Sequence, residues 1–193
     1  MEFADLVRKS RTYRRFDGKH AISSQTMRSL IECARLTPSG GNMQTLRYVC
    51  TCSPEWNEKV FPTLAWAGYL PEWVGPAQHE RPTAYVVICS DASLKKVTPE
   101  IDVGIAVQTI VLAAASLGLG GCMFGSVKRD RLKEILALPA GLEISLVVAL
   151  GKPVEKVVID ETGPDGSIKY HRDPDGTHHV PKRPLGELLL GVR

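Results

Sequence analysis

The stretch around which the chain is organised is Thr37-Pro38-Ser39-Gly40-Gly41-Asn42-Met43-Gln44. An apolar pattern of helical spacing runs into it, and the strand-like run Arg47–Cys50 leaves it. A plain helix-to-strand turn needs one glycine at the helix end, whereas this stretch has two glycines and several polar side chains. Two interpretations therefore stand level: a glycine-rich connector, or a loop that offers hydrogen-bonding groups to a flat, polar ligand.

Length and composition favour one globular domain over residues 1–193. The chain is 44% hydrophobic and 23% charged, which is enough apolar material for a core. The net charge of +3 is too small to argue for nucleic-acid binding. The N-terminus lacks a basic-then-apolar leader, and an odd number of cysteines, five, argues against a disulfide framework. We expect a cytoplasmic protein with reduced thiols.

The regular elements alternate between helix and strand. Capping residues at Ser23-Ser24 open a helix that ends before Pro38. Thr83–Cys89 and Ile144–Leu150 are apolar runs typical of buried strands. Ile101–Leu119 is predicted to be a long helix that is apolar on most faces. Its most apolar stretch, Ile105–Leu119, is shorter than a membrane span requires. Such a helix must be covered on all sides, either at the heart of the fold or at a subunit interface.

A basic run, Arg11-Thr12-Tyr13-Arg14-Arg15, follows a short N-terminal amphipathic helix. Guanidinium groups donate paired hydrogen bonds to phosphate, and interleaved hydroxyls add further donors. A solvated basic turn is the alternative. The hydroxyls between the arginines favour phosphate binding more than an average basic run would.

The segment Leu64–Pro76 is aromatic and is broken by glycine and proline, so it cannot be one regular element. It could be a lid or pocket wall. Its Trp66 and Tyr69, together with Phe124 from a later segment, are candidate substrate contacts. Packing of these rings over the core is an equal alternative. From Glu155 onward, turns and polar residues predict an extended C-terminal arm over residues 155–193, with a short strand at Ile168–Tyr170. The arm's histidines are better explained as surface residues than as metal ligands, and we predict no metal site.

The chemistry points to a cofactor, because no nucleophile with a base and no catalytic carboxylate pair stands out. A phosphate-binding run and a loop with amide side chains fit flavin mononucleotide (FMN). The chain resembles the nitroreductase family of FMN-dependent oxidoreductases in four stretches that occur in order: Arg11-Thr12-Tyr13-Arg14-Arg15-Phe16, Pro38–Gln44, Gly118-Leu119-Gly120-Gly121 and Lys182-Arg183.

The resemblance implies an α+β fold with a central, mainly antiparallel sheet flanked by helices. It also implies an intertwined homodimer that exchanges the C-terminal arm and places the Ile101–Leu119 helix at the interface. The phosphate would be held by Arg11, Thr12 and Arg14 with Lys182 and Arg183. The Pro38–Gln44 loop of the partner subunit would contact the flavin ring and the ribityl chain. The backbone from Cys122 to Ser126 would approach the edge of the ring. The cofactor-binding residues implied in these two segments are Pro38, Ser39, Gly40, Asn42, Gln44, Cys122, Met123, Gly125 and Ser126.

The implied activity is hydride transfer from NAD(P)H through FMN to a small acceptor such as a nitroaromatic, a quinone or an enone, with no indispensable catalytic residue. Two alternatives share the same FMN residues. One is a flavin-binding or storage protein without NAD(P)H turnover, and the other is a family relative with a specialised acceptor or flavin-consuming chemistry. We expect neither nucleic acid nor a membrane as a partner.

Overall fold

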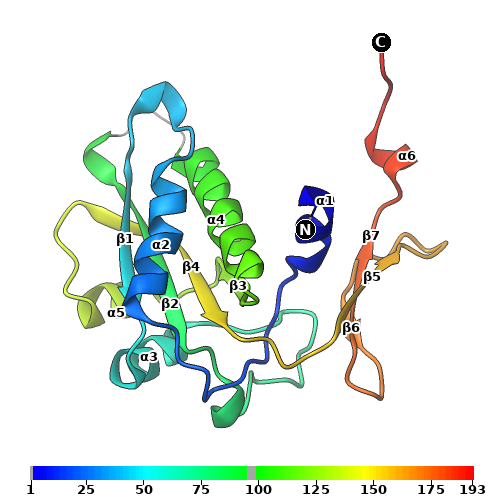
Figure 1. Cartoon of the computed structure of the whole chain (residues 1–193), viewed down its shortest axis with the longest axis horizontal. Helices are drawn as coiled ribbons and strands as arrows, with labels where there is room; N and C mark the ends of the chain where they lie inside the picture. Colours follow the sequence, from blue (N-terminus) through cyan, green and yellow to red (C-terminus); the bar gives the residue numbers. More distant parts are fainter. Residues whose placement is uncertain (1, 95–98) are drawn as a thin grey trace.

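The structure, a computed structural model, describes residues 2–94 and 99–193. A four-stranded antiparallel sheet in the order β1-β2-β4-β3 forms its centre (Figure 1). Its strands are β1 Leu46–Thr51, β2 Ala84–Asp91, β3 Gly120–Phe124 and β4 Leu142–Gly151. The helices around it are α1 Phe3–Lys9, α2 Ser24–Arg35, α3 Pro54–Val60, α4 Pro99–Ser116 and α5 Arg129–Ile135. The predicted α+β architecture with an antiparallel sheet is confirmed.

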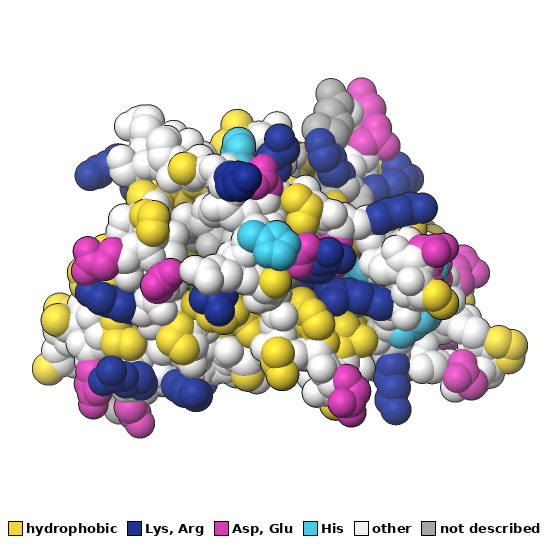
Figure 2. Space-filling model, turned by 90° about the horizontal axis from the view of Figure 1, so that it is seen from below, with side chains coloured by type: hydrophobic (Ala, Val, Ile, Leu, Met, Phe, Trp, Pro, Cys, Tyr) yellow, Lys and Arg dark blue, Asp and Glu magenta, His cyan; other side chains and the backbone are white. Residues whose placement is uncertain are grey.

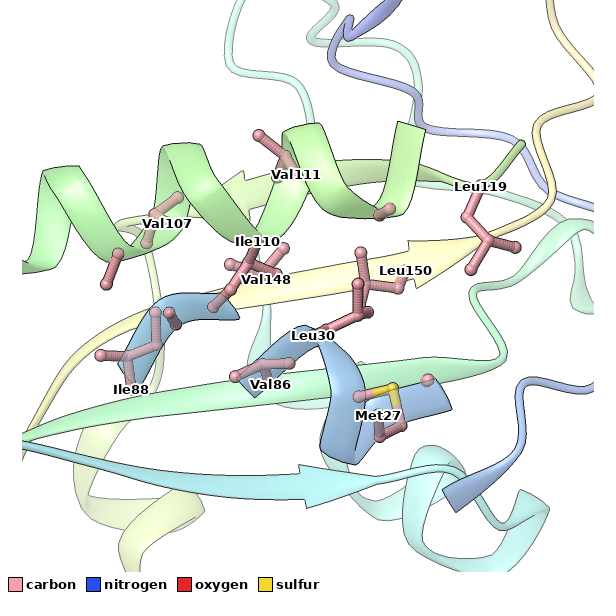
Figure 3. Packing of buried hydrophobic residues seen from close by; sticks show 14 of the residues in the cluster. Met27, Leu30, Val86, Ile88, Val107, Ile110, Val111, Leu119, Val148 and Leu150 are labelled. Carbon is pink, nitrogen blue, oxygen red and sulfur yellow. The ribbon is translucent and has the colours of Figure 1, made fainter. Parts of the chain in front are cut away.

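The central strand β2 is buried on both faces, as its unbroken apolar run predicts. Because side chains alternate along a strand, Val86 and Ile88 point to one face and Tyr85 and Val87 to the other. The first face packs against α2 and α4 and the second against α3 and α5, so helices cover both sides. Figure 3 shows the first of these two cores, with Ile110 of α4 over the sheet.

Helix α4 ends two residues before Gly118, not at Leu119 as its apolar pattern suggested. Gly118 takes a left-handed conformation with φ of +75°, and its N–H donates to Ala115 O at 3.1 Å. The N–H of Leu119 reaches Ala114 O at 3.0 Å. This pair of bonds closes the last turn of a helix around a glycine, and the next residues enter β3.

By length and composition alone α4 could cross a membrane, a property that it shares with buried core helices. Its inner face, which includes Val107 and Ile110, packs in the core. Ile101 on the other side is 61% exposed, and Gly104 is exposed beside it. The helix therefore leaves a partly apolar strip on the surface of the single chain.

The C-terminal arm forms a small sheet of its own, set apart from the main one (Figure 1). It contains β5 Val157–Glu161, β6 His171–Arg172 and β7 His178–Lys182, in the order β5-β7-β6, followed by α6 Leu185–Leu188. β5 and β7 are parallel, and β6 pairs antiparallel with β7. The expected position of a short strand at Ile168–Tyr170 is wrong by a few residues, because the strand that pairs antiparallel with β7, β6, begins at His171.

Candidate functional site

The Thr37–Gln44 loop is fastened to the beginning of α4 by a buried carboxylate. Ser39 Oγ donates to Asp102 Oδ2 at 2.6 Å, and the Gly40 N–H donates to Asp102 Oδ1 at 2.9 Å. Asp102 is only 4% exposed, and it lies in the first turn of α4, where the helix dipole favours a negative charge. The Ser39 side chain is therefore engaged within the chain, although the sequence suggested it as a cofactor contact.

The loop directs its other polar groups outward. A 3₁₀ turn spans Gly40–Asn42, and both Asn42 (φ 54°) and Gln44 (φ 50°) have left-handed backbones. The Gln44 amide nitrogen donates to Asn42 Oδ1 at 3.2 Å, and both side chains are exposed. Residues without glycine's freedom adopt this conformation mostly where surrounding structure holds them, often at functional sites. The loop is a pre-shaped group of amides and not a slack connector.

A groove of 740 Å³ lies beside the loop, between α2 and β1. Its lining includes Pro38, Ser39, Gln44 and Asp102, together with basic side chains of α2 and β1. Apolar side chains of α2 and β1, among them Met27, Ile31 and Leu46, also line the groove, so it combines an apolar wall with the polar groups of the loop.

The Arg11–Phe16 segment lies beyond the other end of α4, where it runs along the free edge of β3. Thr12 forms a parallel bridge with Gly121, and the Tyr13 N–H donates to Gly121 O at 3.0 Å. A Cβ atom on Gly120 would lie 2.4 Å from Tyr13 Cδ2 and 2.6 Å from Pro153 Cγ. Gly120 is therefore needed for this close packing.

Arg11 and Arg14 are both withdrawn from bulk solvent. Arg11 Nη2 donates to Val7 O at 2.7 Å, its buried Nε has no partner among the described residues, and burial lowers its pKa. Arg14 is 8% exposed, and its Nη1 lies 2.9 Å from His178 Nε2. Arg15 instead forms an ion pair with Glu80 at 2.5 Å, so it belongs to the structural frame.

The rest of the Arg14 surroundings come from the arm and from the turn before it. The Tyr170 ring centroid lies 4.4 Å from the Arg14 Cζ atom. Glu155 Oε1 accepts hydrogen bonds from the backbone N–H groups of Arg14 and Arg15, and its other oxygen pairs with Arg172 at 2.9 Å. These contacts dock the arm against the phosphate-binding candidates.

The other two basic candidates lie further along the arm. Lys182 ends β7 and is exposed, and Arg183 pairs with Glu187 of α6 at 3.1 Å. Lys182 is four residues beyond His178, or about 13 Å along the strand. The contacts among described residues thus join Arg14 to the arm through His178 and Tyr170, not through Lys182 or Arg183.

The backbone after Gly121 presents an edge with mixed burial. Cys122 is buried, and burial raises the pKa of its thiol to about 12, so the thiol is not reactive. Met123 is 42% exposed, and Gly125 and Ser126 are exposed. The carbonyl of Gly125 accepts from Arg129 at 3.0 Å and that of Ser126 from the Ala65 N–H at 3.1 Å. The segment is thereby held at the molecular surface.

The aromatic candidates are divided between the core and the surface. Phe124 is 4% exposed and meets Trp66 edge-on, with ring centroids 4.6 Å apart, so both rings pack on the core face of α3 and α5. Tyr69 is 47% exposed, and its ring lies 4.9 Å from that of Tyr170. The Leu64–Pro76 segment therefore contacts the arm next to Arg14, and Tyr69 is its candidate closest to solvent.

Sequence reasoning missed four residues of this arrangement: Asp102, Glu155, Tyr170 and His178. Asp102 carried a signal, because a lone carboxylate in an apolar helix needs a partner. The other three belong to a polar stretch in which nothing in the sequence marks which side chains turn inward.

The two groups of candidates lie at opposite ends of α4. Asp102 anchors the loop near the start of the helix, whereas Thr12 and Tyr13 bond to Gly121, after its end. From residue 102 to residue 116 the helix rises about 21 Å. One chain therefore carries a polar loop and a basic segment that face different regions of space.

Comparison with known proteins adds an independent finding. The model of the nitroreductase family matches residues 7–152. A protein from Archaeoglobus fulgidus that carries the name NADH dehydrogenase/NAD(P)H nitroreductase is 28% identical over 142 residues, which cover 70% of this chain and 76% of that protein.

Solved structures share the fold. An FMN-dependent nitroreductase from Clostridium difficile R20291 has a TM-score of 0.63 at 18% identity, over 80% of this chain and 89% of the other. A protein from Exiguobacterium sibiricum, solved in complex with FMN, has a TM-score of 0.65 at 19% identity, over 80% of this chain and 90% of the other. With the family model matching most of the sequence, the chain belongs to the nitroreductase family.

Proposed function

We propose that this chain is an FMN-dependent oxidoreductase that passes a hydride from NAD(P)H through flavin to a small acceptor such as a nitroaromatic, a quinone or an enone. The observation that carries the proposal is the state of Arg14. Its guanidinium is almost buried, yet among the described residues its side chain has no carboxylate partner. A buried cation without a counter-ion is unfavourable, so this position favours an anionic ligand.

The residues around Arg14 fit a phosphate monoester. Arg11 adds a second guanidinium with an unused buried Nε, and Thr12 adds a hydroxyl on the same short segment. Arginine binds phosphate through paired N–H donors, which suits this arrangement. Arg11, Thr12 and Arg14 would hold the phosphate, and Lys182 and Arg183 would add positive charge from the arm.

The ring end of the cofactor would meet amides and backbone. Asn42 and Gln44 offer both donors and acceptors, and the edge from Met123 to Ser126 lies at the surface. When bound, FMN would accept a hydride from NAD(P)H and pass it on, so the organic chemistry belongs to the cofactor. The chain binds, orients and shields the reactants, and we assign it no catalytic residue.

A homodimer accounts for the separation of the two groups of candidates. With about 21 Å of helix between them, the loop and the basic segment of one chain would serve two different flavins. The exposed strip of α4 and the leucines of the tail, among them Leu185 (71% exposed) and Leu190 (97% exposed), are surfaces that a second copy would cover. All five cysteines are free in the structure, which supports a cytoplasmic setting.

The absorption spectrum of the purified protein tests the proposal. We expect flavin bands that bleach when NADH or NADPH is added without oxygen and that return with a quinone. A protein that stays colourless after incubation with FMN would exclude the proposal. Flavin bands that neither nicotinamide bleaches would instead indicate a flavin-binding or storage protein.

The loop has a test of its own. Asn42→Ala removes one outward amide, and we expect a several-fold loss of FMN affinity in a fluorescence titration while the oligomeric state is kept. Gln25→Ala, at an exposed amide on α2, is the control and should leave the affinity unchanged. Equal affinity for all three proteins would return the loop to the role of a connector.

A further inference from the structure

A cluster of arm residues lies against Arg14 without any role in the proposed chemistry. His178 is wholly buried, and its Nε2 lies 2.9 Å from Arg14 Nη1. Tyr170 lies across the guanidinium, with its ring centroid 5.3 Å from that of His178. The arm thus supplies two of the immediate neighbours of the buried arginine.

The protonation of His178 follows from its partner. Arginine has only donors, so His178 Nε2 must be the acceptor, which requires the neutral ring with its proton on Nδ1. Burial and the nearby charge of Arg14 lower the pKa of His178 to about 4, with Arg172, His171 and His179 adding to the effect. The ring is therefore uncharged near neutral pH and does not neutralise Arg14.

The contacts fix the arginine at both ends of its side chain. Glu155 holds the backbone N–H of Arg14, His178 fixes Nη1, and Tyr170 lies against the guanidinium face. A long side chain that is fixed before binding loses less conformational freedom when a ligand arrives. Since all these groups except Glu155 are neutral, they orient the guanidinium and leave its charge for an anion.

We propose that His178 is a positioning residue for the phosphate end of the cofactor. It holds Arg14 through one N–H and leaves the remaining guanidinium donors for the phosphate. The inference rests on the proposed FMN function, and it adds that docking of the arm sets the phosphate affinity. His178 itself does not touch the cofactor.

The test compares two ligands that differ only in the phosphate. Apoprotein is titrated with FMN and with riboflavin, using wild type, His178→Leu, His178→Gln and the control His171→Gln. His171 is exposed on the neighbouring strand β6, stacked on His179 at 4.9 Å. Circular dichroism and size-exclusion chromatography verify that each variant is folded and keeps the oligomeric state of wild type.

We expect His178→Leu to weaken FMN binding by about tenfold or more, the effect of losing a hydrogen bond to a charged group. Riboflavin affinity should change by less than about twofold. His178→Gln keeps an acceptor and should recover most of the loss, and His171→Gln should match wild type.

Other outcomes separate this inference from the proposed function. Equal weakening of FMN and riboflavin by His178→Leu would show a merely structural role and overturn the inference, as would unchanged FMN binding. Wild type that binds neither ligand would contradict the proposed function itself. If His178→Leu does not fold, the wild type and His178→Gln decide the matter by pH. Between pH 6 and pH 4 the wild type should lose FMN affinity more steeply than His178→Gln does, because protonated His178 would place a positive charge next to Arg14. Identical pH profiles of the two proteins would overturn the inference.

Discussion

At the scale of single residues, buried polar groups and a glycine decide the shape of the Thr37–Gln44 loop and of the Arg11–Phe16 segment. Asp102 fixes the loop, Glu155 fixes the backbone at Arg14, and Gly120 lets Tyr13 approach the sheet. Each acts through contacts between residues far apart in the sequence. Substitutions at these positions should therefore have larger effects than their residue types alone suggest.

The first prediction concerns Asp102. Asp102→Ala leaves the Gly40 N–H and the Ser39 hydroxyl without their acceptor, and we expect a loss of about 2–4 kcal/mol in the free energy of unfolding. Asp102→Asn keeps an acceptor for Gly40 and should cost about 1 kcal/mol or less. Urea denaturation measures both. Glu100→Ala, exposed in the same turn, is the control, and equal effects of Asp102→Ala and Glu100→Ala would contradict the anchoring role.

The second prediction concerns Gly120. Gly120→Ala forces a methyl group into contact with the Tyr13 ring and Pro153, so we expect a destabilisation of about 1–3 kcal/mol in thermal or urea unfolding. Gly125→Ala is the matched control, because a Cβ there meets nothing within 4 Å. A Gly120→Ala protein as stable as Gly125→Ala would show that the edge segment can move away freely.

At the scale of elements, sequence patterns predicted the buried strands and helices but not where α4 ends or how the strands of the arm pair. The unbroken apolar run of β2 was confirmed as a core strand, and α4 packs its inner face in the core while its other side, with Ile101, stays at the surface of the single chain. The end of α4 at Ser116 and the register of the arm depended on backbone geometry and on pairing between distant residues. The arm sequence gave no apolar alternation, so its three strands could not be placed by periodicity.

At the surface of the arm sheet, His179 contacts Asp160 and Asp173 in a pH-dependent cluster, which we call the clasp. His179 Nδ1 contacts Asp160 Oδ2 at 2.8 Å and its Nε2 contacts Asp173 Oδ2 at 3.2 Å, which joins β5, β7 and the turn between β6 and β7. The hydrogen bonds to Asp160 and Asp173 raise the pKa of His179, and the bond to His179 lowers the pKa of Asp173.

The third prediction follows from the signs of these shifts. A raised histidine pKa contributes stability that is complete below its unfolded value of 6.5 and is lost as the pH rises through the higher folded value. The lowered Asp173 pKa adds stability above 3.8 that is lost as the pH falls through the folded value. Amide exchange of β5 and β7 should therefore accelerate from pH 6 to pH 8.5, after correction for intrinsic rates, and less so in His179→Gln. The same pH dependence in both proteins would contradict the clasp.

At the scale of the whole molecule, charges of both signs are spread over the surface. Figure 2 shows basic and acidic side chains interspersed with apolar ones on the visible face, in keeping with the net charge of +3. Three of the four ordered stretches that indicated the family lie within residues 7–152, which the family model matches, whereas Lys182-Arg183 lies beyond that range. What the sequence could not predict is which polar groups face inward, since Ser39 and Asn42 look alike in the sequence and differ only in what lies opposite them.

The placement of the loop and the basic segment at opposite ends of α4 has a genetic consequence. If each flavin is shared between two copies, a chain damaged at Arg14 and a chain damaged at Asn42 can complement one another. In a mixed dimer both lesions would fall in one site, and the other site would be built entirely from undamaged parts. Co-expressed Arg14→Ala and Asn42→Ala chains with different tags, purified as the mixed species, should bind one tight FMN per dimer, whereas neither parent dimer should bind any as tightly as wild type. Two defective alleles would then restore one working site, because α4 separates the two groups of binding residues within each chain.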